Sequence, residues 1–304
     1  MELSIVLINY NSTKFTINCI NSIRKVVSSQ LLYEIIVVDN NSEDIEVSEL
    51  KKNLKKFDYE NLVFIESNEN LGFSGGNMLG ANVSSGNYIA FVNNDTIFHE
   101  DSFSILYNFM QDDKSIGVST CLSKNKEGKD FACFDHFIGI RKEIFGRWIL
   151  ENVFKKPKRK LTYDYPIIVD AVQGCFMFFD KNAFFESGGF DKKIFLFYEE
   201  IDICKRLKDK GYKVVYNPAT YFIHFQGAST RNSISKKMEI MVSFFYVLKK
   251  NFGFTRHYIL LIFLFFKYLL KSIFNSENLI FLKIIMTNNK FKYSMRKKQL
   301  INGC

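Results

Sequence analysis

The sequence lacks the cysteine patterns that build zinc sites or disulfide frameworks. Its six cysteines form no CxxC pair and stand at no Cys/His spacing that binds zinc. This absence favours a reduced, cytosolic setting. The first eight residues, MELSIVLI, carry no basic leader and run directly into Asn9, so they predict a first strand in place of a signal peptide.

Two nucleotide-binding signatures are also missing near the N-terminus. No GxGxxG follows the first apolar run, which argues against a dinucleotide-dependent oxidoreductase. The segment NYNSTK, residues 9 to 14, contains no glycine. A nucleotidyltransferase with a similar sheet would use a glycine-rich, lysine-bearing loop close to the first strand, so that class is disfavoured as well.

The apolar run Tyr258 to Phe266 (YILLIFLFF) is shorter than the about 20 residues that span a bilayer. Arg256, Lys267 and Lys271 bracket it, which predicts an interfacial amphipathic helix; a buried core or oligomer helix and a true span are alternatives. Residues 236–304 hold 13 of the 41 Lys/Arg and 2 of the 32 Asp/Glu. This basic, apolar segment favours a phospholipid surface over nucleic acid as its partner.

Short apolar runs alternate with helical stretches in the first half of the chain. The expected strands are Leu3 to Ile8, Glu34 to Val38, Leu62 to Ile65 and Tyr88 to Val92. The expected helices are Ser12 to Val27, with Ser12 as N-cap, Glu46 to Phe57, and Gly76 to Val83. Strands apolar on both faces are typical of buried parallel strands, so the pattern predicts an α/β fold with a mostly parallel central sheet and helices on both faces.

The second half is less regular. Residues 123 to 165 predict no clear element and carry the basic run Lys155 to Lys160, which is expected either as a solvated loop or as a contact for a phosphate-bearing acceptor or membrane. Two or three helices are expected within residues 233 to 287. Between these regions the pattern predicts strands at Ile167 to Val172, Cys175 to Phe179, Lys213 to Tyr216 and Thr220 to His224, and a helix from Glu199 to Lys210 that ends at Gly211.

Asn and Asp gather where the first strands end. Because ligands of open α/β sheets bind at the carboxyl ends of strands, these polar ends predict a ligand crevice. Ordinary turn chemistry is the alternative for any one of them. The four segments are Asn9 to Asn11, Asp39 to Ser42, Ser67 to Gly72 and Asn93 to Asp95.

Three further positions carry acid/base or metal chemistry. Asp95 follows a buried strand and could hold a hard divalent cation that neutralises a diphosphate. Glu199, Glu200 and Asp202 crowd the start of a helix, where like charges raise a carboxyl pKa toward that of a general base; capping of the helix is the alternative. His224 ends an apolar strand and is either a satisfied core residue or a second metal ligand.

Taken together, motifs over residues 3 to 232 resemble the family 2 glycosyltransferases with the GT-A fold, especially the rhamnosyltransferase-like branch that builds bacterial surface polysaccharides. The order and spacing of the motifs are those of the family. The matching segments are IVLINYNS (5–12), IIVVDNNS (35–42), NENLGFSGGNMLG (68–80), YIAFVNNDT (88–96), GGFDKKIFLFYEEIDICKRLKDKGYKVVYNP (188–218) and HFQGAST (224–230).

The resemblance implies a role for each matching position. Asp95 and His224 would bind Mg²⁺ or Mn²⁺, and Glu200 would be the catalytic base, with Glu199 and Asp202 as alternatives. The family commonly has Asp where this chain has Asn93 and Glu200. The donor nucleotide would be contacted by Asn9, Asn11, Asp39, Asn41, Asn70, Gly72, Gly76, Asn77 and Asn94.

The resemblance also implies an organisation and an activity. Residues 1–232 would form the catalytic domain, with a nucleotide-binding half (1–122) and an acceptor-binding, catalytic half (123–232), and residues 233–304 would form basic, membrane-associating helices. The expected reaction is inverting transfer from a nucleotide-diphosphate sugar, dTDP-rhamnose or alternatively a UDP-hexose, to a glycan or lipid-linked acceptor. The expected place is the inner face of the bacterial cytoplasmic membrane. A non-catalytic, membrane-associated binding protein is the alternative to an enzyme.

Overall fold

The four apolar runs of the first half form the parallel part of the sheet in a computed structural model, which describes residues 1–57, 59–131, 133–225 and 234–297. β1 (Leu3–Asn9) lies between β2 (Tyr33–Asp39) and β4 (Tyr88–Asn93), and β3 (Leu62–Glu66) pairs with β2. β1, β2 and β4 are buried over nearly their whole length. Continuous Ile, Val and Leu suit strands that helices cover on both faces, and the four strand predictions are confirmed.

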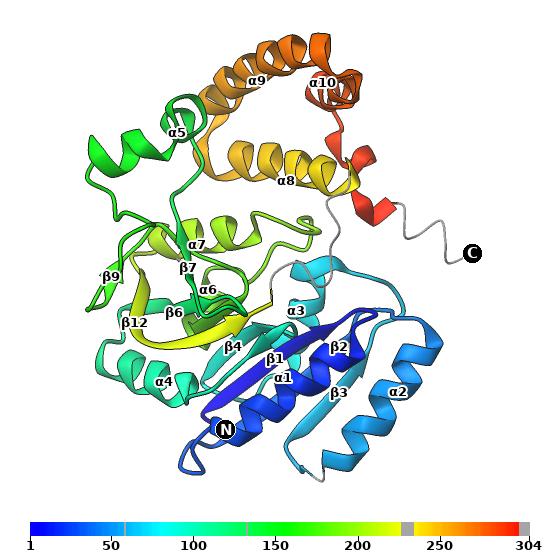
Figure 1. Ribbon diagram of the computed structural model, residues 1–304, viewed down its shortest axis with the longest axis vertical. Coiled ribbons are helices and arrows are strands. Elements are labelled where there is room, and N and C mark those ends of the chain that lie inside the picture. The colour runs from blue at the N-terminus through cyan, green and yellow to red at the C-terminus, as the bar shows by residue number, and fades with distance from the viewer. Residues whose placement is uncertain (58, 132, 226–233, 298–304) are drawn as a thin grey trace.

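Helices connect these strands and cover the sheet. α1 (Thr13–Val26) and α2 (Asp44–Leu54) lie on the face of the sheet turned toward the viewer in Figure 1. The 3₁₀ turn η1 (Lys55–Phe57) extends α2, and α3 (Gly72–Val83) begins four residues earlier than expected. Ser12 occupies the N-cap position of α1, but its side chain makes no capping hydrogen bond.

Beyond β4 the sheet becomes mixed. β11 (Phe176–Asp180) runs antiparallel to both β4 and β6 (Ile116–Lys124), whereas β12 (Lys213–His224) runs parallel to β6. In the described residues the central order is β3-β2-β1-β4-β11-β6-β12-β5, with β5 at Thr96–Ile97. The short strands β7 (Asp130–Phe131) and β9 (Ile167–Ile168) pair with β6 and β12, and β8 (Phe134–Asp135) pairs with β10 (Ala171–Val172).

Two strand predictions need correction. β12 is one strand where two were expected, and its register shifts between Tyr216 and Tyr221. Pro218 lies inside that shift, and because proline lacks an N–H it is tolerated only where pairing is interrupted. The strand expected over Ile167 to Val172 is divided between β9 and β10, which join different sheets.

The irregular middle contains a helix that the sequence pattern did not predict. α5 (Ile140–Asn152) has no buried residue and kinks at Gly146, where φ is +75°. A helix without a buried stripe has no hydrophobic periodicity to detect. The other helices of this half are α4 (Ser102–Asp112), α6 (Lys181–Glu186) and α7 (Glu199–Asp209).

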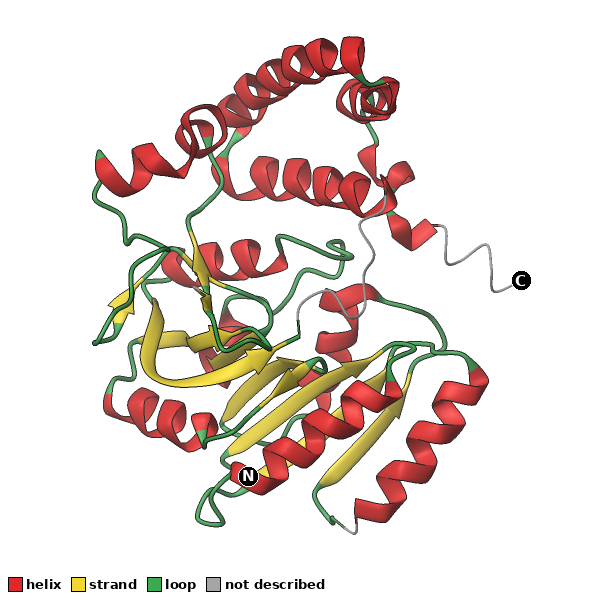
Figure 2. Ribbon diagram, in the orientation of Figure 1, coloured by secondary structure: helices red, strands yellow, loops and turns green. Residues whose placement is uncertain are grey.

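The C-terminal helices form a layer that is separated from the sheet by α7 (Figures 1 and 2). α8 (Ile234–Phe252) is anchored to the body by hydrogen bonds from Ser243 Oγ to the Leu196 carbonyl (2.8 Å) and from Tyr246 OH to Asp191 Oδ2 (2.7 Å). α9 (Phe254–Phe274), η2 (Ser276–Asn278), α10 (Leu279–Met286) and η3 (Lys290–Tyr293) follow. The division of the chain at residue 232 stays a prediction.

The expectation that the apolar run is too short to span a membrane is wrong on length. α9 is 21 residues long with a mean hydropathy of 1.6, which is long and apolar enough for a bilayer by length and composition. The helix continues on both sides of Tyr258 to Phe266 because Lys267 and Lys271 do not end it. Only 11% of its apolar window is buried against the rest of the chain.

Candidate functional site

A cleft of about 250 Å³ opens at the carboxyl ends of β1 and β4. Such a position is where open α/β sheets bind ligands. Of the positions expected to contact the donor or metal, the cleft is lined by Asn70, Gly72, Asn77, Asn94 and Asp95. Side chains from the segment before α7, Phe195 and Leu196, complete the opposite wall.

Asp39 lies behind this wall and does not line the cleft. It is fully buried, and its carboxylate accepts hydrogen bonds from Asn9 Nδ2 (2.8 Å) and from Ser42, through both the backbone N–H (2.9 Å) and Oγ (2.6 Å). Asn9 is also fully buried, and its Oδ1 accepts from Thr16 Oγ1 (2.7 Å). Asp39 and Asn9 therefore join the ends of β1 and β2 beneath the site.

The neighbouring residue, Asn40, faces the cleft instead, and the sequence pattern missed it. Its Nδ2 donates to Asn70 Oδ1 and to the Gly72 carbonyl, both at 3.1 Å, and its Oδ1 accepts from the Leu71 N–H (3.0 Å). Asn40 thereby fixes the loop that leads into α3. Gly76, which was expected in the site, packs beneath it: a Cβ there would lie 3.0 Å from Ile8 Cδ1.

Glycine is required at position 72 because the backbone there lies very close to the backbone of Phe195. Its φ is +70°, and a Cβ at this position would lie 2.1 Å from the carbonyl oxygen of Phe195. The same carbonyl accepts a hydrogen bond from the Phe73 N–H (2.8 Å). The start of α3 and the segment before α7 are thus held together at the cleft, a contact that only glycine permits.

The remaining asparagines differ in exposure. Asn94 lines the cleft and donates to Ser12 Oγ (2.7 Å) and Thr16 Oγ1 (2.8 Å), which ties the end of β4 to the start of α1. Asn11 and Asn41 are exposed turn residues with φ of +47° and +65°. Asn11 Oδ1 accepts from the Glu43 N–H (2.8 Å), so its side chain closes a turn.

Asp95 and His224 are brought together by strand pairing. β12 runs antiparallel to β5 with His224 opposite Thr96, and His224 Nε2 lies 3.2 Å from Asp95 Oδ1. Burial lowers the imidazole pKa, but the hydrogen bond to Asp95 and the contact with Cys175 outweigh it and raise the pKa to about 10. A proton therefore occupies this pair, and a cation bound there would have to displace it.

This donor set suits a divalent cation that takes further ligands from substrate. One carboxylate oxygen and one imidazole nitrogen are ligands that Mn²⁺ accepts, and Mg²⁺ is commonly held by one or two protein groups together with phosphate oxygens. Within the described residues no three His, Cys, Asp or Glu side chains form a metal-binding group. A diphosphate and water would have to complete the coordination.

Glu199 and Glu200 begin α7, Glu199 as a buried side chain and Glu200 as a partly exposed one. Burial, followed by the charge of Glu200, raises the pKa of Glu199 well above its usual range, and Glu199 Oε2 has no hydrogen-bond partner among the described residues. Burial raises the pKa of Glu200 to about 7, where repulsion by Asp135 adds to the shift and the Glu200 N–H and Lys142 oppose it. The raised pKa favours the neutral form of Glu199, and Glu200 titrates in the range that suits a general base.

The backbone before α7 is strained. Phe197 and Tyr198 both adopt left-handed conformations, with φ of +70° and +67°. Aromatic residues rarely adopt such angles, which cost about 1–3 kcal/mol each and gather at functional sites. These two left-handed residues set the direction in which the chain enters α7 at Glu199 and Glu200.

Asp202 is committed to structural contacts. It is fully buried, accepts from Asn251 Nδ2 (2.7 Å) and Arg206 Nε (3.1 Å), and pairs with Lys250 Nζ (2.8 Å). Oδ1 therefore fastens α8 to α7, and Oδ2 is held by Arg206 within α7. This arrangement leaves Glu199 and Glu200 as the carboxylates with free acid/base capacity.

Glu199 and the Asp95–His224 pair meet at one short segment. Glu199 Oε1 lies 3.9 Å from the position of a Cβ built on Gly174, and the adjacent Cys175 contacts His224. Phe73, a cleft residue, lies 3.5 Å from the same Gly174 position. Glu199 and the Asp95–His224 pair are thus linked through Gly174 and Cys175, and Phe73 connects the same segment to the cleft.

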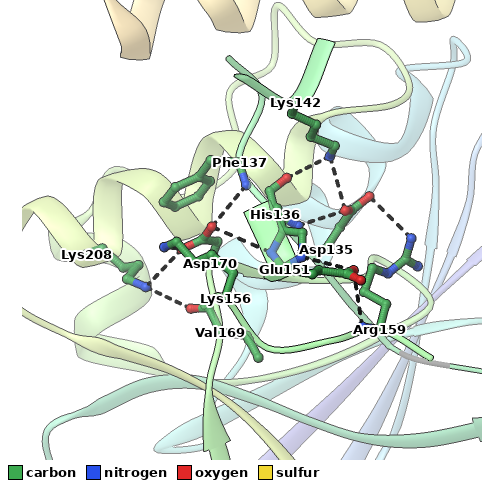
Figure 3. Close-up of polar contacts among 10 residues, drawn as sticks. All are labelled: Asp135, His136, Phe137, Lys142, Glu151, Lys156, Arg159, Val169, Asp170 and Lys208. Carbon is green, nitrogen blue, oxygen red and sulfur yellow. Dashed lines mark hydrogen bonds and ion pairs between the residues drawn. The ribbon is translucent and has the colours of Figure 1, made fainter. Parts of the chain in front are cut away.

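A polar network surrounds the His136 ring (Figure 3), and the charges of its Asp135 and Lys142 act on Glu200. Lys142 Nζ pairs with Asp135 (3.1 Å) and donates to the His136 carbonyl (2.7 Å). The buried His136 ring faces Glu151 (3.4 Å) and Asp170 (3.9 Å). The basic run expected as a loop folds back onto these acids: Lys156 pairs with Asp170 (2.7 Å) and Arg159 with Asp135 (3.7 Å).

A family model described as Glycosyl transferase family 2 matches residues 4–184. The chain belongs to this family. Rhamnosyltransferase WbbL of Escherichia coli (strain K12) is 28% identical over 172 residues, which are 54% of this chain and 62% of WbbL. Poly(ribitol-phosphate) beta-glucosyltransferase of Bacillus spizizenii (strain ATCC 23059 / NRRL B-14472 / W23) is 31% identical over 157 residues, 51% of this chain and 22% of that protein. The chain thus spans less than two thirds of each relative.

Solved structures agree with the GT-A fold of a family 2 member. A structure of GalNAc-T7 with UDP, GalNAc and Mn²⁺ superposes with a TM-score of 0.61 at 16% identity, covering 82% of this chain and 48% of that one. The mannosyltransferase PcManGT from Pyrobaculum calidifontis, in complex with GDP-Man and Mn²⁺, gives 0.57 at 13% identity, covering 82% and 63%. The α/β fold expected from the sequence is confirmed.

One cleft residue of this family 2 chain comes from far along the sequence. Met295 lines the cleft although it lies beyond α10. Glu239 of α8 holds it in place, because Glu239 Oε2 accepts from the Met295 N–H (2.6 Å) and Oε1 accepts from Ser294 Oγ (3.1 Å). No local sequence pattern signals such a contact.

Proposed function

We propose that this family 2 chain transfers a sugar from a nucleotide-diphosphate donor to a hydroxyl acceptor with inversion at the anomeric carbon. The observation that carries the proposal is a carboxylate with a pKa of about 7, Glu200, whose neighbour Glu199 reaches the Gly174–Cys175 segment that also contacts His224. A base and a site for the charge of a leaving diphosphate are the two parts that this reaction needs.

Glu200 is the proposed base. Its carboxylate takes the proton of the acceptor hydroxyl as the hydroxyl oxygen bonds to the anomeric carbon, and the bond from that carbon to the diphosphate oxygen breaks with its electron pair leaving on the diphosphate. The raised pKa of Glu199 favours its neutral form, which limits the charge beside Glu200. Asp202 is not proposed as the base because its oxygens are already bonded.

Asp95 and His224 would hold Mg²⁺ or Mn²⁺, which supplies charge neutralisation to the leaving diphosphate. Asn40, Asn70, Gly72, Asn77 and Asn94 are proposed to contact the donor, since they line the cleft or fix its loop. Asp39 and Asn9 are proposed to hold that surface from behind.

A rhamnosyl donor such as dTDP-rhamnose is our first choice, supported by the likeness to the E. coli rhamnosyltransferase. A UDP-sugar is the second candidate, supported by the likeness to the B. spizizenii glucosyltransferase. We further propose a glycan or lipid-linked acceptor in bacterial surface polysaccharide synthesis. The exposed apolar surface of α9 supports attachment to the inner face of the cytoplasmic membrane.

The test is a donor panel that contains dTDP-rhamnose, UDP-glucose and UDP-galactose. Each donor is assayed for released nucleoside diphosphate with a lipid-linked acceptor, with and without Mn²⁺. Release that depends on both the acceptor and the metal is the expected result. Binding of donors without any turnover would favour a non-catalytic binding protein, and turnover of a UDP-hexose alone would replace the rhamnosyl assignment.

A further inference from the structure

α5 presents large apolar side chains to solvent. Phe145 is 62% exposed and Trp148 is 68% exposed, and none of the 13 residues of the helix is buried. Arg141 and Arg147 are exposed on the same helix. Tryptophan and arginine beside exposed phenylalanine are typical of a helix that lies at a membrane–water interface.

α9 carries a second exposed apolar surface. The helix packs through His257, Leu260 and Leu264, which share one side. On the opposite side runs a stripe at helical spacing in which every residue is at least 40% exposed: Tyr258, Ile262, Phe266, Leu269 and Ile273. Phe274, at the end of the helix, is 90% exposed.

The two helices are neighbours. α5 packs against α9, and the charge of Lys267 on α9 acts on Glu143 of α5. Both helices lie at the end of the molecule that is far from the N-terminal strands (Figure 1). Helix α5 belongs to the middle of the chain, so a segment outside the C-terminal helices packs against α9.

We propose that the exposed faces of α5 and α9 form one lipid-facing surface that lies in the headgroup region of a bilayer containing anionic phospholipid. The inference rests on the membrane attachment proposed above and adds α5, with Phe145 and Trp148, as its second half. Charge complementarity supports an anionic bilayer as the occupant, because Arg141 and Arg147 are exposed on α5 beside the aromatic pair. Glu200 lies within electrostatic range of Lys142 at the start of α5. The proposed base is therefore close to the helix that forms one half of this surface.

Trp148 is the only tryptophan of the chain, so its fluorescence reports on α5 alone. The full-length protein is mixed with phosphatidylcholine vesicles containing about one third phosphatidylglycerol, a fraction high enough to attract basic side chains. We expect the Trp148 emission to move to shorter wavelength and to be quenched by lipids brominated near the headgroup. We also expect weaker binding to vesicles of phosphatidylcholine alone.

A matched pair of variants measures the contribution of α5. Phe145→Ser should lower the vesicle partition coefficient about tenfold, the equivalent of losing one buried aromatic side chain. Ile45→Ser removes an 81% exposed apolar side chain from α2 and should change nothing. Circular dichroism and donor hydrolysis without vesicles verify that both variants are folded.

The outcomes separate this inference from the attachment itself. If the protein does not sediment with either vesicle, membrane attachment is wrong altogether. If it sediments while Trp148 emission and the Phe145→Ser partition stay unchanged, α9 binds without α5 and the joint surface is overturned. Quenching only by lipids brominated deep in the acyl chains, as for an inserted helix, would overturn the headgroup position, and equal binding to both vesicles would overturn the role of anionic lipid.

Discussion

Buried Asp95 and partly exposed His224 form a pair with 3.2 Å between Oδ1 and Nε2, although the ends of β4 and β12 are distant in sequence. If this pair holds the cation, Asp95→Ala should lower turnover about 100-fold or more, the usual loss when charge stabilisation of a leaving group is removed. His224→Ala should cost about tenfold and raise the Mn²⁺ concentration needed for half-maximal rate. Asp130→Ala, an exposed β7 carboxylate, is the control. An Asp95→Ala protein with half the original turnover would refute the assignment.

The pH dependence of turnover should reveal Glu200. Its carboxyl has a pKa of about 7, and the deprotonated form is the proposed base, so kcat should rise with pH and level off above about 7. Below that value each pH unit should cost about tenfold. Glu200→Gln should lower kcat by a factor of about 10² to 10⁴ and abolish the rise, while donor affinity measured by calorimetry is retained. A larger loss of kcat in Glu199→Gln would identify Glu199 as the base.

Glu199 should make stability fall as pH rises. Its folded pKa lies above its unfolded value, so the folded state holds a proton that the unfolded state releases, and stability is lost progressively above the unfolded pKa. Glu199→Gln keeps the shape of the protonated side chain and removes this loss. Its melting temperature should therefore exceed that of the parent protein at pH 8 and match it near pH 4. If the melting temperatures of the variant and the parent protein differed by the same amount at pH 4 and pH 8, the pKa of the Glu199 carboxyl would not be raised in the folded state.

Asp202 should matter for stability. Asp202→Ala removes a fully buried carboxylate that joins Arg206, Lys250 and Asn251, and we expect a loss of about 3 kcal/mol in urea unfolding. Asp209→Ala breaks an exposed pair with Lys205 on the same helix and should cost less than about 0.5 kcal/mol. Equal losses in the two variants would mean that Asp202 does not fasten α8 to α7.

Gly72 and Gly128 form a natural control pair. Both have positive φ, +70° and +78°, but a Cβ at Gly72 would collide with the Phe195 carbonyl whereas one at Gly128 meets nothing within 4 Å. Gly128→Ala should lower the free energy of unfolding only by the cost of a left-handed alanine, about 1 kcal/mol. Gly72→Ala should cost clearly more and also weaken donor binding, measured by calorimetry. Comparable stability and affinity in both variants would rule out the close approach at Gly72.

The sequence predicted those elements that have a strong local signal. β1 to β4 are continuous apolar runs and were located to within a residue or so, and α7 was located with its end at Gly211. α5 could not be found because nothing on it is buried, and the single β12 could not be foreseen because Pro218 is a usual strand breaker. At β12 tertiary pairing overrides the local preference of proline.

The candidate site was predictable in its location but not in every side chain. Asn and Asp at strand ends indicated the crevice, and Asp95 and His224 do lie together. Which of two adjacent residues faces a cleft depends on the path of the turn, so Asn40 was missed beside Asp39. Met295 reaches the cleft only through the packing of α8 and its contact with Glu239, which no nearby residue signals.

The two left-handed residues before α7 have a consequence for the rate of the proposed reaction. Phe197 and Tyr198 take up their left-handed backbone conformations when the chain folds, and the surrounding packing keeps them in these conformations. The carboxylates that follow are consequently aimed in the resting molecule, and no rearrangement of this turn has to precede each encounter with an acceptor.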